Sequence, residues 1–283
     1  MPQPDFERLN RMIRESGADW VAGPTSRSRY TAEPDIAGIF GVAATPSEIT
    51  ASMDEARAFD AELAGLKLAL PKRLDWRWTA KRRWVPKVRN QETCGTCVAF
   101  ATCTCLESRL MIANKLAISA TPDLSEAHLF FCGSTSNCIQ GWYPRKAFTY
   151  AKTNGIGAEA AFPYATHTGS CTPIQPVLKA VKPRSAASIT ARKLALQKGP
   201  VVACLDVCDD FLSYRSGLYK RVSTTSSGQH ALCVVGYDDV QHSWIARNSW
   251  GTGWGETGDV RIAYGQCGID TTYPFFFSGT QLV

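Results

Sequence analysis

The stretch that decides the fold reads NQETCGTCVAF and spans residues 90–100. Its second cysteine, Cys97, stands where a turn of small and polar residues leads into a long apolar segment. Apolar residues recur at helical spacing from Ala99 to Leu110, which predicts a helix over residues 97–112. A thiol at a helix N-terminus faces the positive end of the helix dipole, which favours the thiolate. Cys97 is therefore a candidate nucleophile.

Three more residues supply the groups that a thiol nucleophile needs. Gln91 lies just before Cys97 and offers a side-chain amide N–H to the same place. His230 precedes one apolar run far downstream, and Asn248 ends another. Cys, His and Asn together form a nucleophile, a base and a group that orients the base. Taken singly, each residue has a structural alternative: a buried thiol, a hydrogen-bonded core histidine, a turn asparagine or a surface amide.

In their order along the chain, these residues resemble the catalytic segments of papain-family cysteine proteases. Residues 90–100 resemble the segment around the family's nucleophile. The sequence NSWGTGWGE at residues 248–256 resembles the family's Asn-Ser-Trp segment almost residue for residue. Shorter pieces that keep the family order are LDWR at 74–77, LSE at 124–126, FPY at 162–164 and CGI at 267–269. The resemblance covers roughly residues 70–275. It implies an α+β, two-lobed papain-like fold, with the active site between a helical lobe and a β-rich lobe.

The resemblance also implies a role for each candidate residue. Cys97 attacks the peptide carbonyl as a thiolate, His230 moves the proton, and Asn248 orients the imidazole. The backbone N–H of Cys97 and the side chain of Gln91 bind the oxyanion, and Trp250 shields the His–Asn hydrogen bond. This chemistry uses a thiolate–imidazolium pair, so no metal or organic cofactor is expected.

The chain has eleven cysteines, an odd number, which leaves at least one free thiol in a monomer. The resemblance pairs Cys94 with Cys138 and Cys132 with Cys171 as disulfides. Cys94 and Cys97 also have the spacing of a redox pair, but the family pieces that follow disfavour that function. A zinc site is disfavoured because no second close Cys/His pair has the required spacing. The unassigned cysteines are Cys103, Cys105, Cys204, Cys208, Cys233 and Cys267.

Two departures from the family pattern fall near the expected cleft. Val98 replaces the aromatic residue that follows the nucleophile, and residues 140–142 read Gln-Gly-Trp in place of a glycine pair in the cleft wall. The implied substrate-binding residues are Gly141, Trp142, Ala231 and Thr272. Thr272, expected at the floor of the S2 pocket, carries no charge. A buried guanidinium there would lack a counter-ion, so we expect an apolar residue at P2.

Within the family, the chain looks most like cathepsin B. DFLSYRSGLY at 210–219 resembles a segment of its β-rich lobe, and WVAG at 20–23 and GIFG at 38–41 resemble its short propeptide. Cathepsin B also has an occluding loop with paired histidines. The corresponding stretch here, about 165–188, is short and holds only His167 and Cys171. We therefore expect no occluding loop, and endopeptidase action.

Residues 1–69, termed the front segment below, are expected to be an inhibitory propeptide, and residues 70–283 the peptidase domain. The front segment carries more acidic than basic side chains, whereas the body is strongly basic. Opposite net charges favour a clamp. The strip Gly38–Gly41 is expected to run past Cys97, since glycines let backbone approach closely.

Periodicity divides the chain further. Helices are predicted at residues 5–17 and 47–67, the second capped by Ser47. The helical lobe is expected at about residues 90–190, with short helices at 125–131 and 144–153. The β-rich lobe is expected at about residues 195–275, because its apolar runs are short and rich in β-branched residues. Those predicted strands are 201–205, 231–237, 244–248 and 260–263.

Composition excludes several other classes. The 283 residues are 45% hydrophobic and 20% charged, which is typical of a globular chain, and no apolar run has the length of a membrane span. The basic cluster at residues 81–89 matches no nucleic-acid-binding motif, so no nucleic-acid or membrane partner is expected.

We expect a monomer that acts on protein and peptide substrates. Its many cysteines favour an oxidising compartment, either a lysosome-like vesicle of the secretory pathway or the outside of the cell, although residues 1–17 show no signal-peptide pattern. The alternative function is that of a papain-fold protein that binds peptides without cleaving them.

Overall fold

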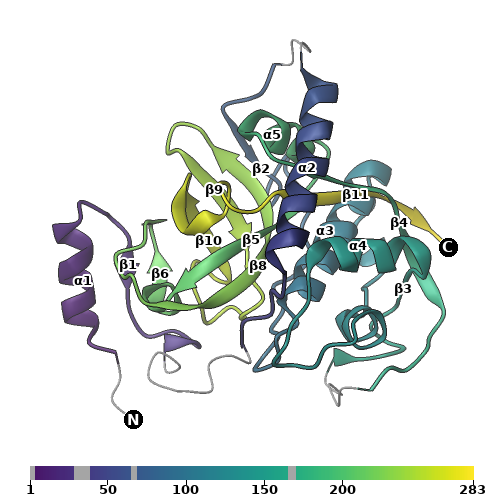
Figure 1. Cartoon of the computed structure of the whole chain (residues 1–283), viewed down its shortest axis with the longest axis horizontal. Coiled ribbons are helices and arrows are strands. Elements are labelled where there is room, and N and C mark those ends of the chain that lie inside the picture. The colour runs from purple at the N-terminus through teal and green to yellow at the C-terminus, as the bar shows by residue number, and fades with distance from the viewer. Residues whose placement is uncertain (1–3, 29–38, 65–68, 165–169) are drawn as a thin grey trace.

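The computed structural model describes residues 4–28, 39–64, 69–164 and 170–283, and it has the predicted α+β architecture (Figure 1). In the described residues the helices are α1 (Phe6–Glu15), α2 (Pro46–Leu63), α3 (Cys97–Asn114), α4 (Pro144–Thr153) and α5 (Ile189–Gln197), the π-helical turn η4 (His128–Cys132), and the 3-10 turns η3 (Ile118–Ala120), η6 (Asp209–Ser213) and η7 (Gln266–Gly268). None of the helices described is both long enough and apolar enough to cross a membrane.

The strands form one large sheet and one small one. They are β1 (Val21–Ala22), β2 (Arg73–Asp75), β3 (Ile156–Gly157), β4 (Pro176–Ala186), β5 (Val201–Cys208), β6 (Tyr214–Ser216), β7 (Leu218–Tyr219), β8 (Ser226–Asp238), β9 (Ser243–Arg247), β10 (Asp259–Ala263) and β11 (Phe275–Leu282). The large sheet has the order β3-β4-β11-β5-β8-β9-β10-β7, with β2 paired to β8. All of its pairs are antiparallel except β10 with β7. In the small sheet, β1 of the front segment pairs with β6 of the body.

Helix α3 is the centre of the helical side. Every residue from Cys97 to Met111 is buried, because the helix packs against α4 and against strands β5, β8 and β11. The predicted helix is therefore confirmed, but it is apolar or enclosed on all sides rather than on one stripe. It ends where Lys115 takes the left-handed conformation, with φ of 54°.

Two hydrophobic cores flank the sheet. One holds α3, η4 and α4, and the other lies among β5 to β10 and around Trp250 and Trp254. The second core also includes residues of the front segment, namely Ile13, Trp20, Ala22, Ile39 and Phe40. The front segment thus completes the apolar packing of the β-rich side.

The predicted strands at 201–205, 231–237, 244–248 and 260–263 are all present, as β5, β8, β9 and β10. The three longest elements that escaped the sequence analysis are β4, α5 and β11. Strand β4 lies inside the range expected for the helical lobe, helix α5 follows it, and β11 extends past residue 275. In β4, charged residues such as Lys179 and Lys182 interrupt the apolar pattern, so no apolar run marked the strand.

The front segment contains the two predicted helices. In α1, the side chain of Asp5 caps the N-terminus by accepting from Arg8 N. The cap of α2 is Thr45 and not Ser47, so that prediction was wrong. Thr45 Oγ1 accepts from Glu48 N at 3.2 Å, and Glu48 Oε2 accepts from Thr45 N at 2.8 Å, which is a reciprocal capping box. Pro46 then takes the first helical position, which displaces Ser47 into the helix.

Helix α2 is held to the body by ion pairs along one side. Glu48 pairs with Lys146 at 2.7 Å, Glu62 with Arg184 at 2.6 Å, and Glu55 with Arg145. In each pair the acid belongs to the front segment and the base to the body, which matches the charge asymmetry of the sequence. Figure 1 shows α2 crossing in front of the molecule, with α1 placed apart from it beside β1 and β6.

The stretch at about 165–188, where the sequence predicts no occluding loop, is described from residue 170 onward. Cys171 forms its disulfide, and residues 176–186 form β4, which pairs with β3 and β11. His167 lies outside the described residues.

Candidate active site

Cys97 opens helix α3 and is completely buried. The turn before it is fixed by the disulfide between Cys94 and Cys138 and by a hydrogen bond from Gly95 N to Cys138 O at 2.7 Å. Burial raises the pKa of the Cys97 thiol to about 12, although backbone hydrogen bonds from Ala231 and other residues oppose the shift. The helix N-terminus alone would favour the thiolate, so the cover over the thiol decides its protonation here.

His230 and Asn248 meet across strands β8 and β9. His230 Nε2 lies 2.8 Å from Asn248 Oδ1, and both side chains are buried. Burial lowers the pKa of His230 to about 3, with Asn248 opposing the shift and Arg27 adding to it. Within the described part of the chain, His230 Nδ1 has no hydrogen-bond partner. The imidazole is therefore neutral, with one ring nitrogen committed to Asn248.

Trp250 covers the His–Asn pair. Its ring centre lies 4.6 Å from that of His230, and Trp254 packs edge-on against it at 5.1 Å. Phe40 of the front segment approaches His230 edge-on at 6.4 Å. The pair is thus enclosed by aromatic rings from both the body and the front segment.

Gln91 is held rigidly beside Cys97. Its Nε2 donates to the carbonyl oxygens of Cys94, at 2.9 Å, and of Ile39, at 3.1 Å. Its Oε1 accepts from Ser249 Oγ at 2.6 Å, so the amide cannot rotate without losing bonds on both sides. The sequence analysis missed Ser249 as a positioning residue, although it stands inside the quoted Asn-Ser-Trp segment.

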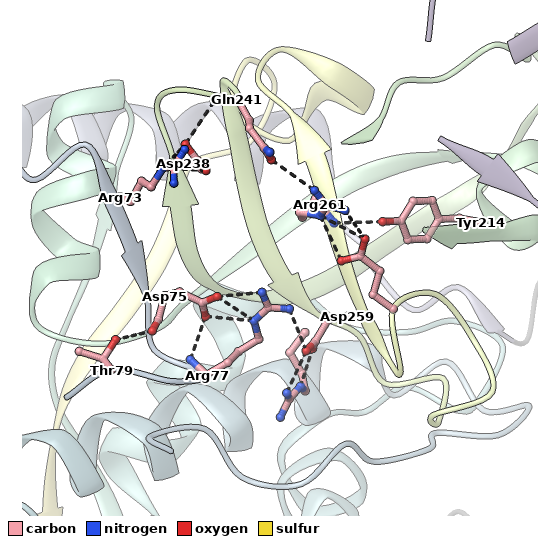
Figure 2. Close-up of polar contacts among 11 residues, drawn as sticks. Arg73, Asp75, Arg77, Thr79, Tyr214, Asp238, Gln241, Asp259 and Arg261 are labelled. Carbon is pink, nitrogen blue, oxygen red and sulfur yellow. Dashed lines mark hydrogen bonds and ion pairs between the residues drawn. The ribbon is translucent and has the colours of Figure 1, made fainter. Parts of the chain in front are cut away.

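A network of ion pairs holds Arg247, the residue that precedes Asn248. Asp259 on β10 accepts from Arg247, the residue before Asn248, at 2.7 and 3.1 Å, and from Arg77 at 3.2 Å. Figure 2 shows Arg77 lying between Asp75 and Asp259 at the edge of the sheet. Asp259 is nearly buried, so these contacts are shielded from water. In the sequence, the only pointer to this network was the family-like LDWR at 74–77, which contains Asp75 and Arg77.

The front segment passes Cys97 through Gly41. A methyl group on the Cα of Gly41 would lie 1.9 Å from the carbonyl oxygen of Gly95, so only glycine fits. Gly41 O accepts from Trp142 N at 2.8 Å, and Ala43 N donates to Trp142 O at 2.8 Å. Gly141 keeps a positive φ of 69° and packs on Gly41, so it is the glycine that this wall requires. Gly38, the first residue of the predicted strip, lies outside the described residues.

Two of the implied substrate-binding residues differ in exposure. Ala231 is buried and faces Cys204 across the β5–β8 pair, whereas Thr272 is exposed in the turn after η7. A methyl group on Gly268 would lie 2.7 Å from Thr272 Oγ1 and 3.1 Å from Asp206 Oδ2. The sequence argument had overlooked this carboxylate, which accepts from Tyr273 Oη at 2.9 Å and from Gln229 Nε2 at 3.2 Å.

The structure contains both disulfides implied by the resemblance, Cys94–Cys138 and Cys132–Cys171. The other cysteines are free and buried, including Cys97 and the six that the sequence left unassigned. Val98 is fully buried in the first turn of α3.

Comparisons with known proteins point to one family. A family model described as papain family cysteine protease matches residues 70–276. The chain is 34% identical to cysteine proteinase 1 of Entamoeba histolytica over 78% of its own length and 72% of that protein. It is 35% identical to pro-cathepsin H of Bos taurus over 70% of its own length and 62% of that protein.

Solved proenzymes share the arrangement of the whole chain. Procathepsin L2 of Tenebrio molitor superposes with a TM-score of 0.79 at 26% identity, covering 97% of this chain and 88% of that one. ProCathepsin B S9 of Trypanosoma congolense gives 0.74 at 20% identity over 99% of both chains, a similarity of fold. The family match covers most of the described body, and the proenzyme matches extend over the front segment. The chain therefore belongs to the papain family of cysteine proteases.

Proposed function

We propose that this chain is the precursor of a cysteine endopeptidase, with Cys97 as nucleophile, His230 as acid and base, and Asn248 as the group that orients His230. One observation carries the proposal. The side-chain amide of Gln91, beside Cys97, already donates to a peptide carbonyl, that of Ile39, at 3.1 Å. A donor aimed at a peptide carbonyl next to a thiol is the arrangement that acyl transfer to sulfur requires.

The proposed reaction begins with proton transfer from Cys97 Sγ to His230 Nδ1. The thiolate then attacks the substrate carbonyl carbon, and the oxygen gains its charge between Gln91 Nε2 and the Cys97 backbone N–H. Collapse of the tetrahedral species breaks the C–N bond, and His230 gives its proton to the leaving amine. Water, deprotonated by His230, then hydrolyses the thioester and restores the thiol.

Asn248 and Trp250 serve the base in this mechanism. The hydrogen bond between Asn248 Oδ1 and His230 Nε2 occupies Nε2 in the neutral ring and in the imidazolium, and leaves Nδ1 to exchange the proton with the thiol. The indole of Trp250 keeps water from competing for that bond, since its ring lies 4.6 Å from the imidazole.

We further propose that the front segment, about residues 1–69, inhibits the peptidase domain at about residues 70–283. It covers Cys97 and His230, and burial favours the neutral thiol and the neutral imidazole over the ion pair. Removal of the front segment would rehydrate both groups and let the ion pair form. Inhibition would thus act on protonation as well as on access.

The finer assignment is that of a cathepsin B-like endopeptidase without an occluding loop, working in a lysosome-like vesicle or outside the cell. It is supported by the cathepsin B-like segments of the sequence and by strand β4 in the place of the loop. P2 is proposed to be apolar, because Ala231 is apolar and Thr272 uncharged. Asp206 is the competing counter-ion, but its carboxylate is occupied by Tyr273 and Gln229.

An active-site titration tests the function. A thiol-reactive peptide epoxide is added to the acid-processed protein, and the labelled residue is located by mass spectrometry. Stoichiometric labelling of Cys97, lost in Cys97→Ala and kept in Cys103→Ala, supports the enzyme. A folded, processed chain that never labels supports the peptide binder instead.

Matched substrates test the specificity. Hydrolysis of peptides with Leu or Arg at P2 is compared, and a quenched peptide is presented with a free or an amidated C-terminus. Leu is expected to be preferred, with no dependence on the free carboxylate. Preference for Arg would assign Asp206 as its counter-ion, and dependence on the carboxylate would contradict endopeptidase action.

A further inference from the structure

Arg27 of the front segment is buried against the body beside the candidate active site. The carbon of its guanidinium lies 5.7 Å from the ring centre of Trp250, and its Nη2 donates to Asn90 Oδ1 at 2.9 Å. Only 3% of the residue is exposed. Arginine is almost never buried to this degree unless it is paired, and the body supplies an amide oxygen and an aromatic face to its guanidinium.

That surface belongs to the body and is built from two backbone segments tied together. Asn90 and Trp250 form a β-bridge. Two backbone hydrogen bonds reinforce it, from Gln91 N to Ser249 O at 2.8 Å and from Gly251 N to Arg89 O at 2.9 Å. Glu92 N donates to Asn90 Oδ1 at 3.1 Å, which fixes the orientation of the accepting oxygen. The acceptor and the aromatic face are therefore set by contacts that do not involve Arg27.

The turn that presents Arg27 is equally well defined. Thr25 Oγ1 accepts from the backbone N of Arg27 at 3.0 Å and donates to Leu212 O at 2.6 Å. Ser26 N donates to Gly253 O at 3.2 Å, and Ser26 Oγ donates to Trp250 O at 3.0 Å. The two residues before the arginine thus anchor the front segment to the body, which holds the side chain in place over the indole.

The surface formed by Trp250 and Asn90 lies near the place where the leaving group of a substrate would pass. Trp250 stacks on His230, which in the proposed mechanism gives its proton to the leaving amine. Residues that follow the scissile bond must therefore pass on the Trp250 side. Gly41 of the front segment lies against Gly141 and Trp142. The ring centre of Phe40 lies 6.3 Å from that of Trp250, so Phe40 and Arg27 both cover the Trp250 side in the precursor.

We propose that Trp250 and Asn90 form a guanidinium-binding subsite for a substrate arginine on the leaving-group side of the scissile bond, which Arg27 occupies in the precursor. The inference rests on the proposed function. A cation over an indole and a charge-assisted hydrogen bond supply the selectivity. Lysine would bring a point charge without the planar stacking, so arginine is favoured over lysine.

The test uses the enzyme released from the full chain by acid processing. Internally quenched peptides carry arginine or citrulline at each of the first three positions after the scissile bond. Citrulline keeps the shape and removes the charge. At one of these positions, kcat/KM is expected to be at least about 5-fold higher for arginine, with lysine between the two. Equal turnover at all three positions would overturn the subsite while leaving the proposed function intact.

Variants assign the subsite to its residues. Asn90→Ala is expected to bring the arginine-to-citrulline ratio toward one, whereas Gln140→Ala, an exposed amide beside Gly141, is expected to keep it. A ratio that survives in Asn90→Ala overturns the assignment. If no peptide is cleaved and the epoxide does not label Cys97, the proposed function fails, and this inference fails with it. If Asn90→Ala does not fold, the comparison of arginine with citrulline in the wild-type enzyme still tests the subsite.

Discussion

His230 Nε2 lies 2.8 Å from Asn248 Oδ1, under the indole of Trp250, so the orientation of the imidazole depends on a single enclosed hydrogen bond. Replacing Asn248 by Ala removes the acceptor and frees the ring. We expect kcat to fall by roughly 10²-fold, as for loss of a positioned acid–base group, with little change in KM because Asn248 does not touch substrate. Steady-state hydrolysis by the processed enzyme measures both constants. Asn154→Ala, an exposed position, is the control, and a wild-type kcat in the Asn248 variant would contradict the assigned role.

Asp259 holds two guanidiniums at once, those of Arg247 and Arg77. In Asp259→Ala, Arg247 loses its carboxylate partner in a partly buried setting, whereas Arg77 keeps its pair with Asp75. We expect the free energy of unfolding to drop by roughly 3–5 kcal/mol. Urea denaturation followed by tryptophan fluorescence gives the value. Asp54→Ala breaks only the exposed pair with Arg57 and should change it by less than about 1 kcal/mol; equal effects in the two variants would refute the argument.

Glu107 in α3 makes folding sensitive to pH. Burial raises its pKa from 4.5 to about 7, although the hydrogen bond from Leu124 N opposes the shift. The folded state therefore binds this proton more tightly than the unfolded state does. The stability that Glu107 contributes through its proton is fully present below pH 4.5 and is lost as the pH rises toward 7.

Glu107→Gln keeps an acceptor for Leu124 N and removes the titration. Thermal midpoints recorded from pH 4 to 8 should fall less steeply in this variant than in the wild type. Glu126, also buried with a raised pKa, keeps some slope in both proteins. Superimposable profiles would show that Glu107 is not the titrating group.

Gly41 has no room for a side chain against Gly95. Gly41→Ala should lift the front segment away from Cys97, so the full-length chain at neutral pH should label with peptide epoxide at least about 10-fold faster than wild type. The rate is followed by mass spectrometry of the intact chain. Ala51→Ser, at an exposed position on α2, is the matched control, and unchanged labelling in the Gly41 variant would contradict the close approach.

Acid alone should not break every ion pair of α2. Hydrogen bonds from Lys146 and from Thr45 lower the pKa of Glu48 to about 2, so this pair keeps its charge well below the pH of an acidic vesicle. Any release of the front segment by acid would therefore have to come from the protonation of carboxylates other than that of Glu48.

The sequence predicted those parts of the structure that depend on local pattern or short motifs. Helix α3, the four strands β5 and β8 to β10, and the two disulfides followed from periodicity or from the family resemblance. Strand β4 could not be predicted in the same way, because its stability comes from pairing with β3 and β11 and not from an apolar run of its own.

The residues of the candidate site also fall into those that the sequence could predict and those that it could not. Motif residues such as Gln91 and His230 were identifiable, whereas the groups that hold them were not. Ser249 fixes Gln91 across a separation of 158 residues, and the carboxylate of Asp206 reaches the Thr272 turn only after the strands have assembled. Contacts of this kind depend on three-dimensional register, which a one-dimensional pattern does not record.

The small β1–β6 sheet and helix α2 attach the front segment to the body at two separate places. A single cut between Ser28 and Ile39 would turn one covalent chain into two species. The piece bearing α1, β1 and Arg27 would then be a free ligand, held by its own contacts and lost on dilution. The piece bearing Gly41 and α2 would remain joined to the body. Full release would accordingly depend on protein concentration for the first piece and on a second cut for the other.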